Sequence, residues 1–188
     1  HQDDPNENVW FGSVAKLCAE KNIPHITPKA DELLDLIPKI QALAPDYIFS
    51  FYYRFMIPEQ ILKCAKIAAL NMHGSLLPKY RGRAPVNWAI LHGETETGAT
   101  LHIMEAKPDA GDIVGQAAVS IGPDETATDV FAKVSKAAVT VIEKALPSLI
   151  KGMIPRQPNE LQKGSYFGGR KPADGQIFWN QTAKQVHD

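Results

Sequence analysis

An amide and an imidazole stand two residues apart in the sequence, at Asn71 and His73. The apolar residues Ile67 to Leu70 precede them without a turn signal, which is typical of a short buried strand. Side chains at positions i and i+2 of a strand lie on one face, about 6.6 Å apart, so both groups can reach one small ligand. An imidazole that accepts a proton and an amide that donates to an oxyanion suit acyl transfer. An isolated pair of this kind is also common in ordinary protein cores.

A cationic loop follows this pair. Gly74, Pro78, Gly82 and Pro85 break any regular strand pairing. The loop carries five polar side chains, which are Ser75, Lys79, Tyr80, Arg81 and Arg83. Arginine guanidinium groups can donate two hydrogen bonds to phosphate oxygens, and a lysine ammonium adds a positive charge. A basic loop that is simply exposed to solvent has the same composition.

A carboxylate, Asp109, follows about three dozen residues after His73, between Pro108 and Gly111. On its own, Asp-Ala-Gly indicates an ordinary turn aspartate. Beside an imidazole, a carboxylate favours the imidazolium and orients the ring. Asp112 is the nearest alternative for this position.

Taken together, three separated segments resemble the signature of the formyltransferases that use 10-formyltetrahydrofolate: Asn71-x-His73, Ser75-Leu-Leu-Pro-Lys-Tyr-Arg-Gly82 and Asp109-Ala-Gly111. The resemblance covers the chain from about Asn8 to Trp179. It implies a Rossmann-like α/β fold, with a mostly parallel twisted sheet flanked by helices. The family has a strand, a helix and a second strand ahead of the position of His1, so we expect an incomplete domain. Residues 1–152 would be its catalytic core and residues 153–188 a loop-rich extension.

The resemblance also implies roles for individual residues. Asn71, His73 and Asp109 match the catalytic trio of the family, while Arg54, Phe55 and Met56 match the loop that holds the pterin ring through its backbone, next to Asp109. The sequence leaves open whether His73 acts as a base or as a charged stabiliser of the oxyanion.

The flanking segments resemble the branch that formylates UDP-4-amino-4-deoxy-L-arabinose, a step of lipid A modification and polymyxin resistance. They are Lys79 to Pro85, Asn87-Trp88, Gly93 to Gly98, Thr100-Leu-His102, Tyr166 to Pro172 and Gln176 to Trp179. This likeness implies a nucleotide sugar as acceptor and a fusion to, or association with, a dehydrogenase-like domain. Lys79, Arg81 and Arg83 would then contact the diphosphate, and Tyr166 and Arg170 the uracil. The alternatives are a methionyl-tRNA or glycinamide ribonucleotide formyltransferase, or a 10-formyltetrahydrofolate hydrolase or folate-binding module.

The composition of the chain limits the kinds of partner that we expect it to bind. Lys plus Arg total 20 against 21 for Asp plus Glu, a net charge of -1, which argues against a nucleic-acid partner. Cys18, Cys64 and the six histidines show no metal-ligand spacing, so we expect no metal. No apolar run is long enough to cross a bilayer and no signal-peptide pattern is present, so we expect a cytoplasmic protein without a membrane partner.

Hydrophobic periodicity predicts the elements that must position these residues. We expect helices at 9–21, 31–43 and 58–64, an extended segment at 24–26, and strands at 46–51 and 67–73. Strands at 97–105 and 113–121 could pair as a hairpin with Asp109 in its loop. A long helix begins near Thr126, where Thr126-x-x-Asp129 resembles a capping box, and Pro147 should kink or weaken its end. Its predicted packing face is Val130, Val134, Ala137, Val141, Ala145 and Leu149. The alternation of predicted helices and strands along the chain indicates a parallel sheet covered by helices, and in such sheets ligands bind at the carboxyl ends of the strands.

Overall fold

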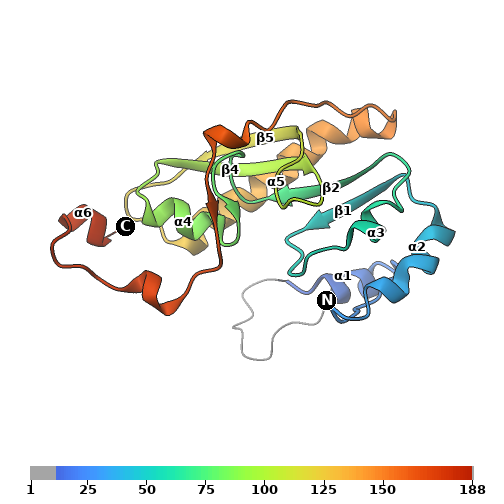
Figure 1. Ribbon diagram of the computed structural model, residues 1–188, viewed down its shortest axis with the longest axis horizontal. Coiled ribbons are helices and arrows are strands. Elements are labelled where there is room, and N and C mark those ends of the chain that lie inside the picture. Colours follow the sequence, from blue (N-terminus) through green and yellow to red (C-terminus); the bar gives the residue numbers. More distant parts are fainter. Residues whose placement is uncertain (1–11, 188) are drawn as a thin grey trace.

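A central sheet organises the protein, which a computed structural model describes over residues 12–187. Among these residues the sheet has the order β1 (Tyr47–Phe51), β2 (Ala68–His73), β4 (Glu96–Ile103) and β5 (Ile113–Ser120) (Figure 1). Strand β1 is parallel to β2, whereas β4 pairs antiparallel with both β2 and β5. The strands of this sheet therefore run in one direction except β4. The predicted α/β fold with helices around a mostly parallel sheet is confirmed, and so is the predicted hairpin of β4 and β5.

The longest helix, α5 (Ala127–Ile150), packs on β4 and β5. It begins at the predicted capping box, in which the Thr126 hydroxyl accepts from the amide of Asp129 and the Asp129 carboxylate accepts from the amide of Thr126. The predicted packing face is buried along its whole length. The expected weakening at Pro147 does not shorten the helix, which continues for another turn to Ile150.

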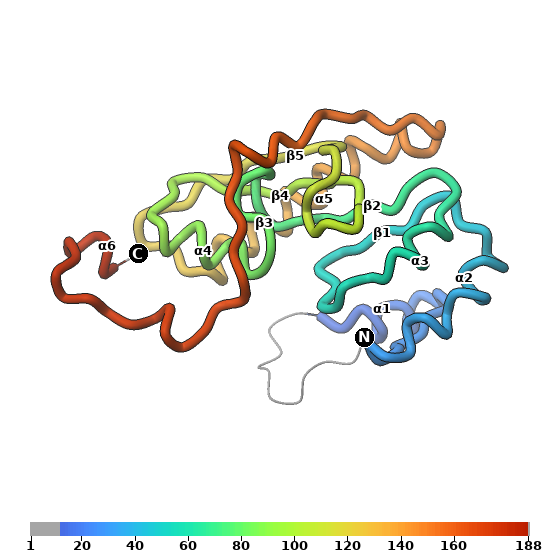
Figure 2. Tube along the Cα trace, in the orientation of Figure 1, coloured from blue at the N-terminus to red at the C-terminus, as the bar shows by residue number. Residues whose placement is uncertain are grey.

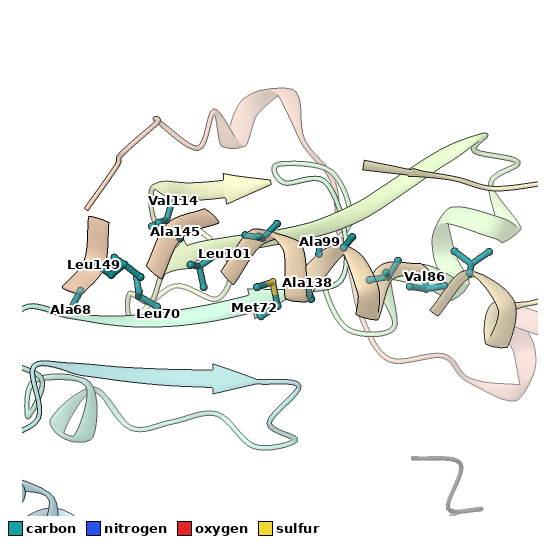
Figure 3. Close-up of a cluster of buried hydrophobic side chains, with 14 residues drawn as sticks. Ala68, Leu70, Met72, Val86, Ala99, Leu101, Val114, Ala138, Ala145 and Leu149 are labelled. Atoms are coloured by element: carbon teal, nitrogen blue, oxygen red, sulfur yellow. The ribbon is translucent and has the colours of Figure 1, made fainter. Parts of the chain in front are cut away.

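The core lies between this helix and the sheet. In Figure 3, Leu70 of β2 lies near Leu149 of α5, Leu101 of β4 near Ala145, and Met72 of β2 near Ala138. Leu70, Met72 and Leu101 are at most 1% exposed. Each such side chain contributes about 2 kcal/mol by leaving water, so β2 and β4 are held in a fixed register. That register positions the polar residues on the other face of the same strands.

The N-terminal helices differ from the prediction. α1 (Val14–Glu20) and α3 (Glu59–Leu62) lie within the predicted ranges, and the part of the first range before residue 12 is outside the described residues. The predicted helix at 31–43 is instead a turn, a 3-10 segment η1 (Leu34–Leu36) and the short α2 (Ile37–Leu43). Pro38 starts α2 because its ring suits the first turn of a helix but not the interior. Residues 24–26 form no strand.

A second, two-stranded sheet joins β3 (Arg81–Gly82) to β6 (Tyr166–Phe167) in parallel. Figure 2 shows the chain after α5 running back past β5 and then descending beside β3. The remaining elements are α4 (Pro85–Leu91), η2 (Leu161–Lys163), η3 (Pro172–Gly175) and α6 (Ala183–His187). None of the described helices combines the length and the apolar character needed to cross a membrane.

Candidate active site

The pairing of β2 with β4 assembles the polar centre of the molecule. In this register Asn71 lies opposite His102, and His73 lies opposite Thr100. Directly opposed residues of an antiparallel pair share a face, so the amide and two imidazoles project from the same side of the sheet. His102 is 1% exposed. In the sequence His102 stands out only as part of the flanking segment Thr100-Leu-His102, because its place beside Asn71 depends on the antiparallel register of β4.

His73 is 6% exposed and held at both ring nitrogens. Its Nε2 donates a hydrogen bond to the carbonyl oxygen of Tyr80 at 2.8 Å, so Nδ1 is the basic nitrogen of the neutral ring. Nδ1 lies 3.6 Å from Oδ1 of Asp109. Burial lowers the pKa of His73 below its usual value, although Asp109 and the Tyr80 carbonyl act in the opposite direction. The expectation that Asp109 would favour the imidazolium is thus outweighed by burial, and the neutral ring predominates at neutral pH.

Asp109 sits in the loop between β4 and β5 and is fixed by several contacts. Its backbone is in the left-handed region, with φ of 49°, and its Oδ2 accepts from the amide of Gly82 at 2.9 Å. Oδ1 faces Nε2 of His102 at 3.4 Å. Burial acts to raise the pKa of the Asp109 carboxyl, but His102 and His73 in their protonated forms, together with the Gly82 amide, lower it. Asp109 is therefore an ionised carboxylate beside His73.

Asn71 is oriented by His102. Nδ1 of His102 donates to the carbonyl oxygen of Ile103 at 2.8 Å, so Nε2 is the acceptor in the tautomer with a single ring proton. The amide nitrogen of Asn71 lies 3.1 Å from that Nε2 and donates to it. An amide has two N–H groups. One is used by His102, and the second is the donor that a developing oxyanion would need.

The competing aspartate, Asp112, contributes its backbone instead: its carbonyl oxygen accepts from the amide of Ile103.

A further residue that the sequence analysis missed is Asn159. Its amide nitrogen donates to the carbonyl oxygens of Asp109 and Gly111, at 3.1 and 3.2 Å. Asn159 lies 50 residues from Asp109 along the chain. No local pattern connects the two.

The predicted substrate residues divide into two groups. Ser75 is fully buried and donates from Oγ to the carbonyl oxygen of Lys79 at 2.7 Å. The hydroxyl of Tyr80 donates to Glu94 at 2.9 Å, and burial together with Glu94 raises the pKa of this phenol. These two side chains stabilise the loop from within. Lys79, by contrast, is mostly exposed, with its ammonium 3.6 Å from Glu94.

The predicted arginines lie around an aromatic cluster. Phe167 of β6 stacks with the rings of Tyr80 and Trp88, and the Arg170 guanidinium lies 4.9 Å from the centre of the Trp88 ring. Arg81 is 8% exposed, 6.0 Å from the ring centre of the exposed Tyr166, and its Nε has no hydrogen-bond partner among the described residues. Arg83 is exposed.

The predicted pterin loop begins at the same edge of the sheet. Strands β1 and β2 are parallel, with Phe51 opposite Met72, so the chain leaving β1 starts beside the end of β2 that carries His73. Arg54 and Phe55 in this loop are half-buried, and Met56 is exposed. Across residues 12–187 no cluster of three or more His, Cys, Asp or Glu side chains has the arrangement of a metal site.

Comparison with known proteins gives a consistent result. Residues 4–146 match the family described as formyl transferase. The chain is similar to a 4-N formyltransferase from Francisella tularensis, with 27% identity and a TM-score of 0.72 over 92% of this chain and 69% of that one. It is also similar to the formyltransferase PseJ from Anoxybacillus kamchatkensis, crystallised with UDP-4,6-dideoxy-4-formamido-L-AltNAc and tetrahydrofolate. There the identity is 28% and the TM-score 0.59, over 65% of this chain and 64% of that one.

An N-formyltransferase from Helicobacter canadensis, in complex with folinic acid and dTDP-3-aminofucose, shares the fold. Its identity is 24% and its TM-score 0.77, over 99% of this chain and 65% of that one. The chain thus spans 64% to 69% of the length of these three structures.

Proposed function

The chain belongs to the formyl transferase family, and from this premise we propose that it transfers a formyl group from 10-formyltetrahydrofolate to the amine of a nucleotide-linked amino sugar. The observation that carries the proposal is the pair of the buried His73 and the partly buried Asp109, next to the oriented amide of Asn71. The acceptor that the flanking segments favour is UDP-4-amino-4-deoxy-L-arabinose. Solved relatives crystallised with nucleotide sugars and folates support the substrate class.

The first step forms the new carbon–nitrogen bond. The amine nitrogen attacks the formyl carbon, and the electron pair of its carbonyl bond moves to the oxygen. The second N–H of Asn71 donates to this oxyanion, while His102 fixes the direction of the amide. A donor held in place before the reaction stabilises the charge as it develops, and the loss of one such donor typically costs a factor of about 100 to 1,000.

The second step moves the proton. Nδ1 of the neutral His73 accepts the proton that the attacking nitrogen must lose, and the carboxylate of Asp109 stabilises the resulting imidazolium. The tetrahedral centre then collapses, the bond from the formyl carbon to N10 of the folate breaks, and His73 returns the proton to N10. The lowered pKa of His73 favours the base role over that of a permanently charged oxyanion stabiliser.

The two substrates would approach this centre from two loops. Backbone groups of Arg54, Phe55 and Met56, next to Asp109, would hold the pterin. The diphosphate would lie against Arg81 with Lys79 and Arg83. Arg81 is 8% exposed, and its Nε has no hydrogen-bond partner among the described residues. A charge buried in this way is costly, so an anionic ligand would stabilise it. The exposed Tyr166 would stack on the base, with Arg170 near it.

An acceptor panel tests the proposal. The protein is incubated with 10-formyltetrahydrofolate and, in separate reactions, with UDP-4-amino-4-deoxy-L-arabinose, a dTDP-linked amino sugar, glycinamide ribonucleotide, methionyl-tRNA or no amine. We expect a formamido product with the UDP sugar, seen by mass spectrometry, and its loss in His73→Ala. Product only with the tRNA or the ribonucleotide, or formate released without an amine, would refute the acceptor class. Product with the dTDP sugar alone would refute only the choice of nucleotide.

A further inference from the structure

A single segment after α5 reaches both halves of the His73–Asp109 pair. We call residues 157–167 the C-terminal strap. It begins at Gln157, whose backbone exchanges hydrogen bonds with that of Ile113 at the start of β5, and it ends at β6. The strap joins the loop that carries Asp109 to the loop that follows His73 (Figure 2).

Asn159 is the contact with Asp109. Its amide nitrogen donates to the carbonyls of Asp109 and Gly111 and so spans the turn that carries the carboxylate. The side chain is 9% exposed. Asp109 adopts a left-handed backbone, which costs a residue with a Cβ about 1 kcal/mol or more unless the surroundings hold it. The two hydrogen bonds of Asn159 are part of those surroundings.

Ser165 is the contact with His73, acting through Tyr80. Oγ of Ser165 accepts from the amide of Tyr80 at 2.9 Å, and the carbonyl oxygen of the same Tyr80 accepts from Nε2 of His73. Tyr80 also has a left-handed backbone, with φ of 55°. The strap passes very close here, because a Cβ built on Gly164 would lie 2.1 Å from the carbonyl oxygen of Pro78.

The geometry points to a role for the C-terminal strap in the reaction: Asn159 and Ser165 are positioning residues that hold Asp109 and His73 at their working separation. The inference rests on the proposed function for its kinetic consequence. The separation itself, 3.6 Å between Nδ1 and Oδ1, depends on two loops that are held by β2 and β4, by the hydrogen bond from the Gly82 amide to Asp109, and by this strap. A displacement of about 1 Å in such a pair can lower a rate about a hundredfold.

The test compares Asn159→Ala, its apolar isostere Asn159→Leu and Ser165→Ala with the wild type. Gln162→Ala is the matched control, because this amide is on the same strap but is exposed and has no hydrogen bond among the described side chains. We expect kcat to fall about 10- to 100-fold in the Asn159 and Ser165 variants, with KM for both substrates changed less than about threefold. The control keeps the kcat of the wild type.

A second measurement does not require activity. The titration of His73 is followed by NMR of its ring nitrogens; Asp109 and His102 are the titratable groups that face it. Asp109 and the Tyr80 carbonyl both act to raise the pKa of His73, so loosening either contact lowers that pKa. Folded variants with the kcat and the His73 titration of the wild type would overturn the role of the strap. If the wild type transfers no formyl group, the proposed function fails. The NMR titration still tests the strap in that case. A lowered His73 pKa in the variants supports the positioning role of the strap, and an unchanged His73 pKa overturns it. If Asn159→Ala does not fold, Asn159→Leu and Ser165→Ala decide between these results.

Discussion

The backbone of Gly82 connects the strap to the carboxylate, and it allows a quantitative prediction. Gly82 has φ of 99°, a conformation that residues with a Cβ rarely adopt. A Cβ built there would lie 2.1 Å from the carbonyl oxygen of Phe167, where an ordinary contact begins at 3.4 Å. In Gly82→Ala the strands β3 and β6 would have to separate by the difference, about 1.3 Å. Because the obstacle is backbone, no side-chain rotation relieves it.

The loss of stability in Gly82→Ala has three parts, which are the strain of the left-handed backbone and the loss of two hydrogen bonds. The left-handed conformation costs about 1 to 2 kcal/mol for alanine. The hydrogen bond from the amide of Arg83 to the carbonyl oxygen of Phe167, 3.0 Å long, contributes about 1 kcal/mol. The bond from the Gly82 amide to Asp109 goes to a charged group and contributes about 2 kcal/mol. We therefore expect Gly82→Ala to lower the free energy of unfolding by about 4 to 5 kcal/mol, which corresponds to roughly 8 to 20 °C in Tm for a chain of this size.

Thermal and urea unfolding measure the loss of stability, and steady-state kinetics measure the loss of alignment. Gly168→Ala is the matched control, since a Cβ there meets no atom within 4 Å and the backbone is not left-handed. We expect the control to unfold within about 0.5 kcal/mol of the wild type and Gly82→Ala to lose at least about tenfold in kcat as well. Equal unfolding midpoints and equal kcat values for the two variants would refute the reasoning about the junction of β3 and β6.

Three further predictions concern the site itself. Asn71→Ala and His73→Ala should each lower kcat at least about a hundredfold in steady-state assays; near-normal turnover in a folded His73→Ala protein would exclude the mechanism. The acid limb of kcat/KM should lie below pH 6.5, the ordinary imidazole value, because burial lowers the pKa of His73. Asp109→Asn should move this limb to still lower pH, since the carboxylate acts to raise that pKa, and a move to higher pH would contradict the assignment. Tyr80→Phe removes the bond to Glu94 and should lower the unfolding free energy by about 1 to 2 kcal/mol without raising KM for the nucleotide sugar; a raised KM would mean that the phenol contacts the substrate.

Elements whose patterns are local were predicted well from the sequence. The long helix was recognisable because Thr126 and Asp129 cap it and an apolar residue recurs every three or four positions on one face. Strand β2 was recognisable because an apolar run leads directly into Asn71 and His73. In both cases neighbours in the sequence determine the structure. The predicted helix at 31–43 was too long, because Pro38 suits only the first turn of a helix and α2 therefore begins at Ile37.

The parts of the site that the sequence analysis missed depend on contacts between distant segments. His102 joins Asn71 only because β4 is antiparallel to β2 in one particular register, and a shift of one residue would turn its ring to the helix-covered face. Asn159 joins Asp109 only because the chain returns from α5 along the edge of β5. A histidine and an asparagine in these positions carry no local signal, since periodicity reports burial and not partners.

The protonation of His73 shows how the missing contacts change the chemistry. From the sequence, the nearby carboxylate argued for an imidazolium, which would be a poor base. The fold adds a second effect of opposite sign, because the core under β2 and the loop above it exclude water from the ring. Desolvation outweighs the carboxylate, so the ring rests neutral while its imidazolium has a partner ready at 3.6 Å. A base of this kind has to bind its proton only transiently, as formyl transfer between two nitrogens requires. In the proposed mechanism the rate depends on the distance between His73 and Asp109, and this distance is set by loops that meet only through tertiary structure.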